Sequence, residues 1–551
     1  MRRRLLVASL LCLLGMGCSF LLSTAEPTQC STDADCAASP TLRNRVCQGG
    51  FCVIPGIDAP GPVIADGSDP CVSTELCTQA NSGQLSVCRT KGGRCQVWQT
   101  EQCRKVSNIA AAKDPNTIII GSILPFTIRQ FDGTKPASDY ADRVRRAIDL
   151  AASEFEAAVP GGVLFPGNTR RPIAVLHCDS GLSADGAMLA MKHLTEVVGS
   201  PALIVGADED ITTIAAELTA KKTAIACEGC IGALPQGPLA WRIVPRLELE
   251  APMANWRVSQ LESELLALPS PPAKIKIALL MHEERSTRDY ITRLKSILRF
   301  NGGKTISENG ADFKVVVAED TRQTLVAHEK HILELLAFEP DIVLVAMGGD
   351  FSQFYLRSVE ARWTGARRPH YITTGLNYTL ESFGTAVGSN ESLRKRISGT
   401  RPGFAPELQA NVDAFDGRYR PPNNYKDPDG SHSGYDAFYV LGMGILGASS
   451  QPLVDGVHIS AGIERLRSGT VVDFRPENIP FANLTLSTIG SIDVRGLWSD
   501  LDWSITTHDF DASVSMYCLK RDETGSIIIE PNAGVHLTTA TGVVDGAYSC
   551  D

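Results

Sequence analysis

Cys227 and Cys230 are the pair of residues in this sequence whose spacing most directly suggests chemistry. They stand in AIACEGCIGAL at 224–234, as a Cys-x-x-Cys pair. Such a pair can act as a redox centre, bind a metal ion or form a structural disulfide. The redox interpretation needs a helix that starts at the first cysteine and lowers its pKa. The following residues, IGALPQGP, do not form a helical pattern, so this interpretation is disfavoured.

The remaining interpretations of Cys227 and Cys230 are a metal site and a disulfide. A metal ion could recruit Cys178, Asp208 and His177 from neighbouring strand ends, and these residue types suit zinc. A disulfide would join one of the pair to Cys178, or join the two to each other. Adjacent parallel strands lie about 4.8 Å apart, which suits a disulfide. We expect a structural disulfide, with the metal site as the alternative, and no cofactor.

The N-terminus has the pattern of an export signal. Arg2, Arg3 and Arg4 precede the apolar run LLVASLLCLLGMGCSFLL. Cleavage after STA would remove residues 1–25, whereas LLGMGC resembles a lipoprotein box that would lipidate Cys18. We therefore expect a protein of the periplasm or cell envelope, either free or tethered to the membrane only by a lipid. In that compartment most cysteines should form disulfides.

A cysteine-rich region at 26–105 contains two similar units. The first has the spacing C-x5-C-x10-C-x4-C and the second C-x5-C-x10-C-x6-C. Units of this size have too little core to fold without cross-links. Spacing does not select among the three connectivities that four cysteines allow. The disulfide candidates of the chain are Cys30, Cys36, Cys47, Cys52, Cys71, Cys77, Cys88, Cys95, Cys178 and Cys227.

From Thr117 the sequence alternates between apolar strand patterns and amphipathic helix patterns. TIIIGSIL, PIAVLHC, ALIVG and TAIAC are separated by helical segments, and the alternation resumes at KIKIALLM and ends at HYITT. Repeated strand–helix steps predict parallel, doubly wound sheets. A break near Trp241–Pro245 divides the steps into two runs. The sequence therefore predicts an α/β fold with two doubly wound lobes after a small disulfide-rich region.

Four segments in this order resemble the type I periplasmic binding proteins, in particular the branched-chain amino-acid-binding branch of ABC transport receptors. They are IIIGSILPF, AWRIVPRLELEAPMANW, PDIVLVAMGGDFSQFYLRSVEARW and GYDAFYVLGMGI. The resemblance covers most of 115–515 and implies two lobes, joined by a hinge, that close on a small molecule. It implies lobe I at 115–245 and 378–460, and lobe II at 246–377 and 461–551, the last including a C-terminal extension.

Ligands of such folds bind at the carboxyl ends of the parallel strands, so the loops there supply the candidate ligand-binding residues. The resemblance aligns Asp210 with a serine, and Cys230 with a threonine, that hold amino-acid ligands in relatives. The expected ligand-binding residues are Thr127, Asp208, Asp210, Thr212, Glu228, Cys230, Asp350 and Phe351. Because the acids would repel a ligand carboxylate, we expect a polar, cationic or hydroxyl-rich ligand and not a plain amino acid. The alternative is that these acids are solvated loop residues.

The composition and motifs restrict the function further. A net charge of −10 over 551 residues argues against a dedicated nucleic-acid binder. The stretch GSHSG at 430–434 lacks the spacing of a nucleophile elbow, so His432 and Ser433 are expected to be loop polar groups and the protein is not expected to be an enzyme. Two functions stay open: a solute-binding protein that serves an ABC permease or a sensor, and an envelope interaction module that has lost its ligand.

Overall fold

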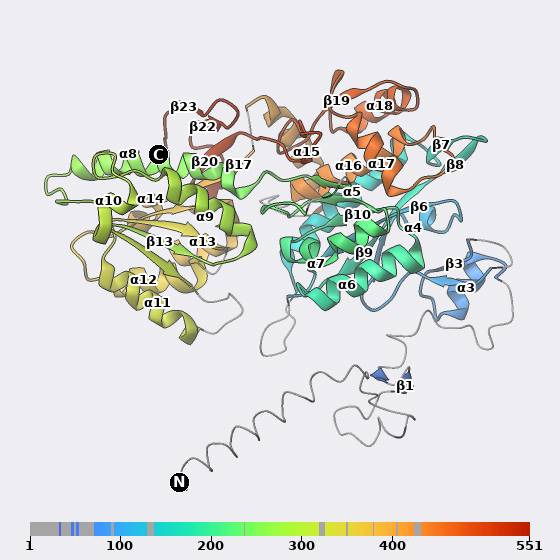
Figure 1. Ribbon diagram of the computed structural model, residues 1–551, viewed down its shortest axis with the longest axis horizontal. Coiled ribbons are helices and arrows are strands. Elements are labelled where there is room, and N and C mark those ends of the chain that lie inside the picture. The colour runs from blue at the N-terminus through green and yellow to red at the C-terminus, as the bar shows by residue number, and fades with distance from the viewer. Residues whose placement is uncertain are drawn as a thin grey trace, which may run out of the picture.

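The computed structural model describes most of the chain from residue 71 to its end. The described residues are 32, 34, 46–48, 51–53 and 71–550, apart from 90–92, 129–136, 236, 238, 319–324, 349–350, 378–379, 404–405 and 424–430. The expected signal sequence, Cys18, Cys30, Cys36 and Asp350 lie outside the described residues. Figure 1 shows two lobes side by side, with the cysteine-rich unit at the edge of one of them.

Lobe I is built on a six-stranded sheet in the order β12-β11-β10-β6-β9-β5. Its strands are β6 (Ile118–Leu124), β9 (Ile173–Asp179), β10 (Ala202–Val205), β11 (Ala224–Cys227), β12 (Ala240–Arg242) and β5 (Lys105–Ser107). All neighbours pair in parallel except β5, which is antiparallel to β9. This sheet confirms the parallel, doubly wound prediction for the first lobe.

Alternate residues of β6 point to opposite faces of this sheet and enter two hydrophobic cores. Ile118 and Ile120 join one core with α5 (Asp139–Ala158) and α16 (Ser431–Gly447), whereas Ile119 and Ile123 join the other with α6 (Ala184–Lys192) and α7 (Asp208–Ala220). Because helices cover both faces, the central strands β6, β10 and β11 are mostly apolar along their whole length. The first core is completed by α15 (Gln409–Asn423), α17 (Gly456–Glu464), α18 (Ile479–Leu486) and the ribbon of β18 (Thr470–Asp473) and β19 (Ile492–Arg495).

Lobe II contains a larger, mixed sheet. Its parallel part has the order β14-β13-β15-β16-β17, and the antiparallel strands β20, β22 and β23 extend it. The strands are β13 (Ile277–Met281), β14 (Phe313–Val317), β15 (Ile342–Ala346), β16 (His370–Thr373), β17 (Ile397–Pro402), β20 (Val514–Arg521), β21 (Ile527–Glu530), β22 (Val535–Thr538) and β23 (Val543–Gly546). The series therefore does not end at HYITT, because β17 adds another parallel strand.

Two groups of helices cover the faces of the lobe II sheet. One core holds α8 (Ala251–Leu266) and α9 (Arg285–Ile297), and the other holds α11 (Leu325–Phe338), α12 (Arg357–Arg362) and α13 (Leu380–Val387). The expected helix at FSQFYLRSVEARW begins as a π-helical turn at Phe351–Leu356 and continues into α12. Among the described residues, no helix is long and apolar enough to cross a membrane.

The chain changes lobes later than the expected boundaries at 377/378 and 460/461. β17, at 397–402, still belongs to the lobe II sheet, and the segment from α15 to Ala512 packs in the core of lobe I. β20 then returns to lobe II by pairing with β17. The chain thus crosses between the lobes near 243–250, between the end of β17 and the start of α15, and near 512–513. The sequence pattern missed these positions because β17, SGTR before Pro402, has little apolar character to mark it as a strand.

The second cysteine-rich unit is a part of lobe I and not a separate region ending at 105. It contains α3 (Thr74–Ala80), with β3 (Ser86–Val87) paired to β4 (Gln96–Val97). Two disulfides, Cys71–Cys88 and Cys77–Cys95, close the unit. Trp98 is buried in the core of lobe I, and β5 forms an edge of its sheet. The Cys103–Cys178 disulfide fastens the junction.

Candidate functional site

A cavity of about 480 Å³ lies between the lobes, at the carboxyl ends of both parallel sheets. Lobe I lines it with the loops after β6, β10 and β11, and with residues of α5 and α16. Lobe II lines it with residues that follow β13, β15 and β16, and with the end of β17. A cavity of this size suits a small organic molecule. Its position agrees with the rule that open α/β sheets bind ligands beyond the carboxyl ends of their strands.

Glu228 is the central polar group of the lobe I wall. It follows β11, is fully buried and lines the cavity. One carboxyl oxygen, Oε2, accepts hydrogen bonds from the Ser433 hydroxyl at 2.8 Å and the Tyr140 hydroxyl at 3.2 Å. The other oxygen, Oε1, has no hydrogen-bond partner among the described residues. Burial raises the pKa of Glu228 to about 8, although both hydroxyl groups oppose this shift.

Asp208 and Asp210 lie in the first turn of α7, after β10. Asp208 is 3% exposed and lines the cavity, and its two oxygens accept the Gly232 N–H at 3.1 and 3.3 Å. Burial raises the pKa of Asp208 to about 6. Asp210 is 1% exposed and does not line the cavity, and burial raises its pKa to about 7. The alternative that Asp208, Asp210 and Glu228 are solvated loop residues is therefore wrong.

Glu250, in the first crossing between the lobes, adds a second fully buried acid to the cavity wall. Its Oε2 accepts the Gly375 N–H at 2.9 Å and the Thr400 hydroxyl at 2.6 Å. Its Oε1 has no hydrogen-bond partner among the described residues. Burial raises the pKa of Glu250 to about 8, and the positive charge of Arg401 opposes this shift. The cavity therefore presents one partly satisfied carboxyl from each side.

Cationic and aromatic side chains also line the cavity. Arg143 of α5 and Arg401 of β17 contribute guanidinium groups, and His282 follows β13. The Arg401 guanidinium lies 5.4 Å from the centre of the Trp498 ring, so a lobe II cation contacts a lobe I aromatic residue. Trp498 is positioned by Asp436 of α16, whose carboxylate accepts the N–H groups of Leu497 and Trp498. Faces of aromatic rings attract cations, including those of ligands.

The other expected ligand-binding residues that the structure describes do not line the cavity. The Thr127 hydroxyl donates to the Asp179 carboxylate at 2.7 Å, and the exposed Thr212 donates to the Asp208 carbonyl within α7. Phe351 is buried in the core of lobe II against Tyr371. Cys230 is fully buried, and its carbonyl oxygen accepts from the Arg242 guanidinium. Of the seven expected residues that the structure describes, only Asp208 and Glu228 line the cavity.

Cys227 and Cys230 form a disulfide with each other. The alternative pairing with Cys178 is wrong, because Cys178 is bound to Cys103. The metal interpretation loses its thiolates for the same reason. His177 hydrogen-bonds to Ser122 at 2.7 Å, to Ser107 at 2.9 Å and to Asp149 at 3.0 Å instead. Cys518 and Cys550 form a further disulfide in lobe II.

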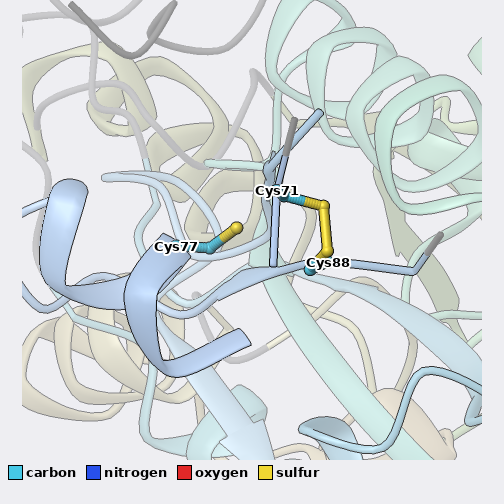
Figure 2. A group of neighbouring side chains, drawn as sticks. All are labelled: Cys71, Cys77 and Cys88. Carbon is cyan, nitrogen blue, oxygen red and sulfur yellow. A yellow bond between two sulfur atoms is a disulfide. The ribbon is translucent and has the colours of Figure 1, made fainter. Parts of the chain in front are cut away.

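Three cysteine sulfur atoms gather in the N-terminal unit, where Figure 2 shows Cys71, Cys77 and Cys88 side by side. Their mutual distances, within 4.8 Å, would suit a metal ion. However, Cys71 is bound to Cys88, and Cys77 is bound to Cys95. Metal binding requires thiolates. This cluster is therefore a pair of neighbouring disulfides, which joins the first cysteine of the unit to the third and the second to the fourth.

Several residues of the site were missed at the level of sequence, namely Tyr140, Arg143, Glu250, His282, Arg401, Ser433 and Trp498. Ser433 was expected in a loop, but it lies in the first turn of α16 and hydrogen-bonds to Glu228. The run GYDAFYVLGMGI contained a signal, because a long apolar helix extended by one turn would include Ser433. Nothing local distinguishes Trp498 or Arg401, which reach the cavity only because the chain crosses between the lobes.

Comparison with known proteins finds structures of similar fold but no match in sequence. The chain matches no protein-family model and no curated protein sequence. A solved structure of the branched-chain amino acid transporter substrate-binding protein LivJ from Streptococcus pneumoniae, in complex with isoleucine, has a TM-score of 0.53 and 14% identity. The similarity covers 75% of this chain and 100% of that one.

Two further structures give similar values. A periplasmic binding protein type 1 from Bordetella pertussis has a TM-score of 0.51 and 15% identity over 75% of this chain and 100% of its own. An ABC transporter solute-binding protein from Rhodopseudomonas palustris, in complex with 3,4-dihydroxybenzoic acid, has a TM-score of 0.52 and 12% identity. The similarity covers 79% of this chain and 98% of that one. This chain therefore has the fold of the type I periplasmic binding proteins.

Proposed function

We propose that the protein is an extracytoplasmic solute-binding protein that captures a small polar molecule between its two lobes. The observation that carries this proposal is the interlobe cavity of about 480 Å³, which buried polar groups of both lobes line. Groups held in place before binding lower the cost of ordering them when a ligand arrives. A ligand that contacts both lobes favours the closed arrangement, because only that arrangement makes both sets of contacts.

The proposed ligand carries a cationic or hydroxyl-rich group that binds at Glu228. The Oε1 atom of Glu228 needs a donor, and Asp208 and Glu250 add further acidic groups to the same wall. Tyr140 and Trp498 provide aromatic surface that can contact a cation. The guanidinium groups of Arg143 and Arg401 could bind a second, electronegative group on the ligand. A plain amino acid is disfavoured, because above about pH 6 Asp208 is ionised and would repel a carboxylate placed near it.

The role of the bound molecule is proposed from the fold. Two of the similar structures are described as binding proteins of transporters, and one of these transporters is named as an ABC transporter. We propose delivery to an ABC permease or to a sensor at the membrane. The alternative is an envelope interaction module that retains the fold without a ligand. The disulfide-closed unit fixed to lobe I favours this alternative, because it offers a rigid surface outside the cavity.

Binding of a panel of small molecules tests the proposal. The panel holds amines, polyols and amino acids, and binding is measured by calorimetry and by the shift in melting temperature. We expect an amine or polyol to bind and Glu228→Gln to weaken a cationic ligand about tenfold or more, because a charge-assisted hydrogen bond is lost. Affinity for a cation should rise between pH 6 and about pH 8, since Glu228 must release its proton, and Glu228→Gln should leave only a smaller rise due to Glu250.

The matched control is Glu523→Gln, an exposed acid in the turn after β20. It should bind as the natural protein does. Native mass spectrometry of protein purified from its own cell envelope complements the panel by detecting a retained ligand. If no compound binds and no extra mass is retained, the solute-binding proposal is wrong and the interaction module is left. If the ligand binds equally well to Glu228→Gln, the proposed ligand class is wrong although the function stands.

A further inference from the structure

The loop that follows β11 touches both lobes, and we name residues 227–233 the bridging loop. In lobe I it supplies Glu228, Gly229 and Ile231 to the cavity wall. Across the cavity the guanidinium of Arg285, the first residue of α9, donates a hydrogen bond of 2.8 Å to the Ala233 carbonyl. Ile231 also packs against the lobe II core that contains α8 and α9. The bridging loop is therefore a direct contact between the lobes.

The contact is close enough to depend on the backbone path of the loop. A Cβ atom on Gly232 would lie 3.2 Å from the Arg285 carbonyl oxygen and 3.3 Å from the Ser286 Cα. A Cβ atom on Gly229 would lie 2.2 Å from the Gly206 carbonyl oxygen. Glycine at both positions lets the loop fit between the strand ends of lobe I and the start of α9. Two glycines in seven residues also make the free loop flexible.

Three sets of interactions within lobe I restrain the backbone of the bridging loop. The Cys227–Cys230 disulfide closes the first turn of the loop. The guanidinium of Arg242 donates to the carbonyl oxygens of Cys230 and Gly232, the latter at 2.6 Å, and forms an ion pair with Asp509. The Asp208 carboxylate accepts the Gly232 N–H. Of these interactions, the disulfide is the covalent one, and it flanks Glu228 directly.

We propose that the bridging loop is the contact through which lobe I holds lobe II over the cavity, and that the Cys227–Cys230 disulfide keeps the loop in the conformation that makes this contact. The disulfide thus acts as a positioning cross-link for lobe closure and for Glu228. This inference rests on the proposed function for its purpose, but its test needs no ligand, so either can fail without the other.

The energetic reasoning concerns two states of the molecule. Without the cross-link, the Gly-rich loop gains conformational freedom, so ordering it for the contact with lobe II costs entropy. A change in the free-energy difference between the open and closed arrangements shifts their populations. The other interlobe contact described above, Arg401 with Trp498, is a single cation–ring contact. The bridging loop therefore has a large share in closure.

Hydrogen exchange and small-angle scattering of the full chain test this inference. The variant is Cys227→Ser with Cys230→Ser, and the matched control is Cys518→Ser with Cys550→Ser, which removes one disulfide from lobe II away from the cavity. In the first variant we expect amides of the first two turns of α9 to exchange at least fivefold faster and the radius of gyration to increase. The control should show neither change. Faster exchange confined to 227–233, with an unchanged radius of gyration, would overturn the proposal.

A second variant weakens the contact from the opposite lobe and leaves the disulfide intact. Arg285→Gln removes the donor to the Ala233 carbonyl, and Arg293→Gln, exposed on the same helix, is its control. Arg285→Gln should increase the radius of gyration and α9 exchange in the same direction, whereas Arg293→Gln should not. This variant decides the question if the double serine variant fails to fold. If Arg285→Gln leaves both quantities unchanged, the bridging loop does not hold the lobes together.

Discussion

Buried acids are the feature of this protein that matters most at the scale of single residues. Glu228 and Glu250 are fully buried beside the cavity, and each has one carboxyl oxygen that accepts hydrogen bonds and one without a partner among the described residues. An unpaired charge in such a place is strongly disfavoured, so each acid keeps its proton to about pH 8. A buried carboxyl oxygen without a hydrogen-bond partner costs folding free energy. This is consistent with a binding role for both acids.

Glu250 makes the folded protein less stable as pH rises. The unfolded chain releases this proton near pH 4.5, whereas the folded protein keeps it to about pH 8. Between these values the folded state binds more protons, so the stability from this group is present below pH 4.5 and is lost up to pH 8. Glu250→Gln cannot titrate. The loss of unfolding free energy between pH 5 and pH 8 should be smaller in this variant, by on the order of 2–4 kcal/mol.

Urea unfolding at several pH values measures this difference. Glu523→Gln, whose exposed side chain is in water in both states, should keep the pH dependence of the natural protein. A Glu250→Gln variant with the same pH dependence as the natural protein would show that Glu250 is ionised in the fold. The other buried acids with raised pKa, among them Asp436, contribute in the same direction, so some dependence on pH should persist in the variant.

At the scale of elements, α16 and α17 are held together by close contact between glycines. A Cβ atom on Gly447 of α16 would lie 2.7 Å from the Cα of Gly462 in α17. A Cβ atom on Gly462 would lie 2.1 Å from the Gly444 carbonyl oxygen. These glycines let the two helices approach at backbone distance. Since α16 also carries Ser433 and Asp436, this packing positions part of the cavity wall.

Gly462→Ala should therefore destabilise lobe I. The added methyl group has no space unless the helices separate, and overpacking of this kind costs about 1–3 kcal/mol. Gly384→Ala in α13 is the matched control, because a Cβ there meets no atom within 4 Å. It should be neutral or stabilise by up to about 1 kcal/mol through helix propensity. Thermal unfolding of the two variants measures the contrast, and equal melting temperatures would mean that α16 and α17 can move apart without cost.

At the scale of the whole molecule, the second cysteine-rich unit belongs to the structure of lobe I. Trp98 is 1% exposed within the lobe I core, β5 pairs with β9, and Cys103 is bound to Cys178. In Figure 1 this unit lies against lobe I near α6. The unit is thus fastened by a side chain, a strand and a disulfide together. Its removal should expose core surface and leave an edge of the sheet unpaired.

Two shortened chains test this attachment. A chain that starts at residue 70 keeps the unit and is the reference for the melting temperature. A chain that starts at residue 115, with Cys178→Ser to prevent mispairing, loses the disulfide and the packing of Trp98. Each of these losses costs about 2–5 kcal/mol. Its melting temperature should therefore fall by several degrees or more. Equal melting temperatures would show that the unit is an independent appendage.

The sequence by itself determined the elements of this protein and the general position of its site. Strands buried on both faces are apolar along their whole length, and the helices between them are amphipathic, so β6, β9, β10, β11, β13 and β15 could be read directly. Because parallel strands end at a common edge, Asp208 and Glu228 could also be placed at the cavity. These predictions depend only on the residue pattern within each segment and not on contacts with distant parts of the chain.

Tertiary structure alone decided which chemistry meets in the cavity. Glu250, Arg401 and Trp498 reach it where the chain crosses between the lobes, and the crossings depend on pairings such as β17 with β20, which join residues more than 100 positions apart. The disulfide pairing also depends on the tertiary structure, since Cys227 is bonded to Cys230 and Cys178 is bonded to Cys103. Spacing restricts such contacts but cannot select among them, because the choice depends on the packing of the entire chain.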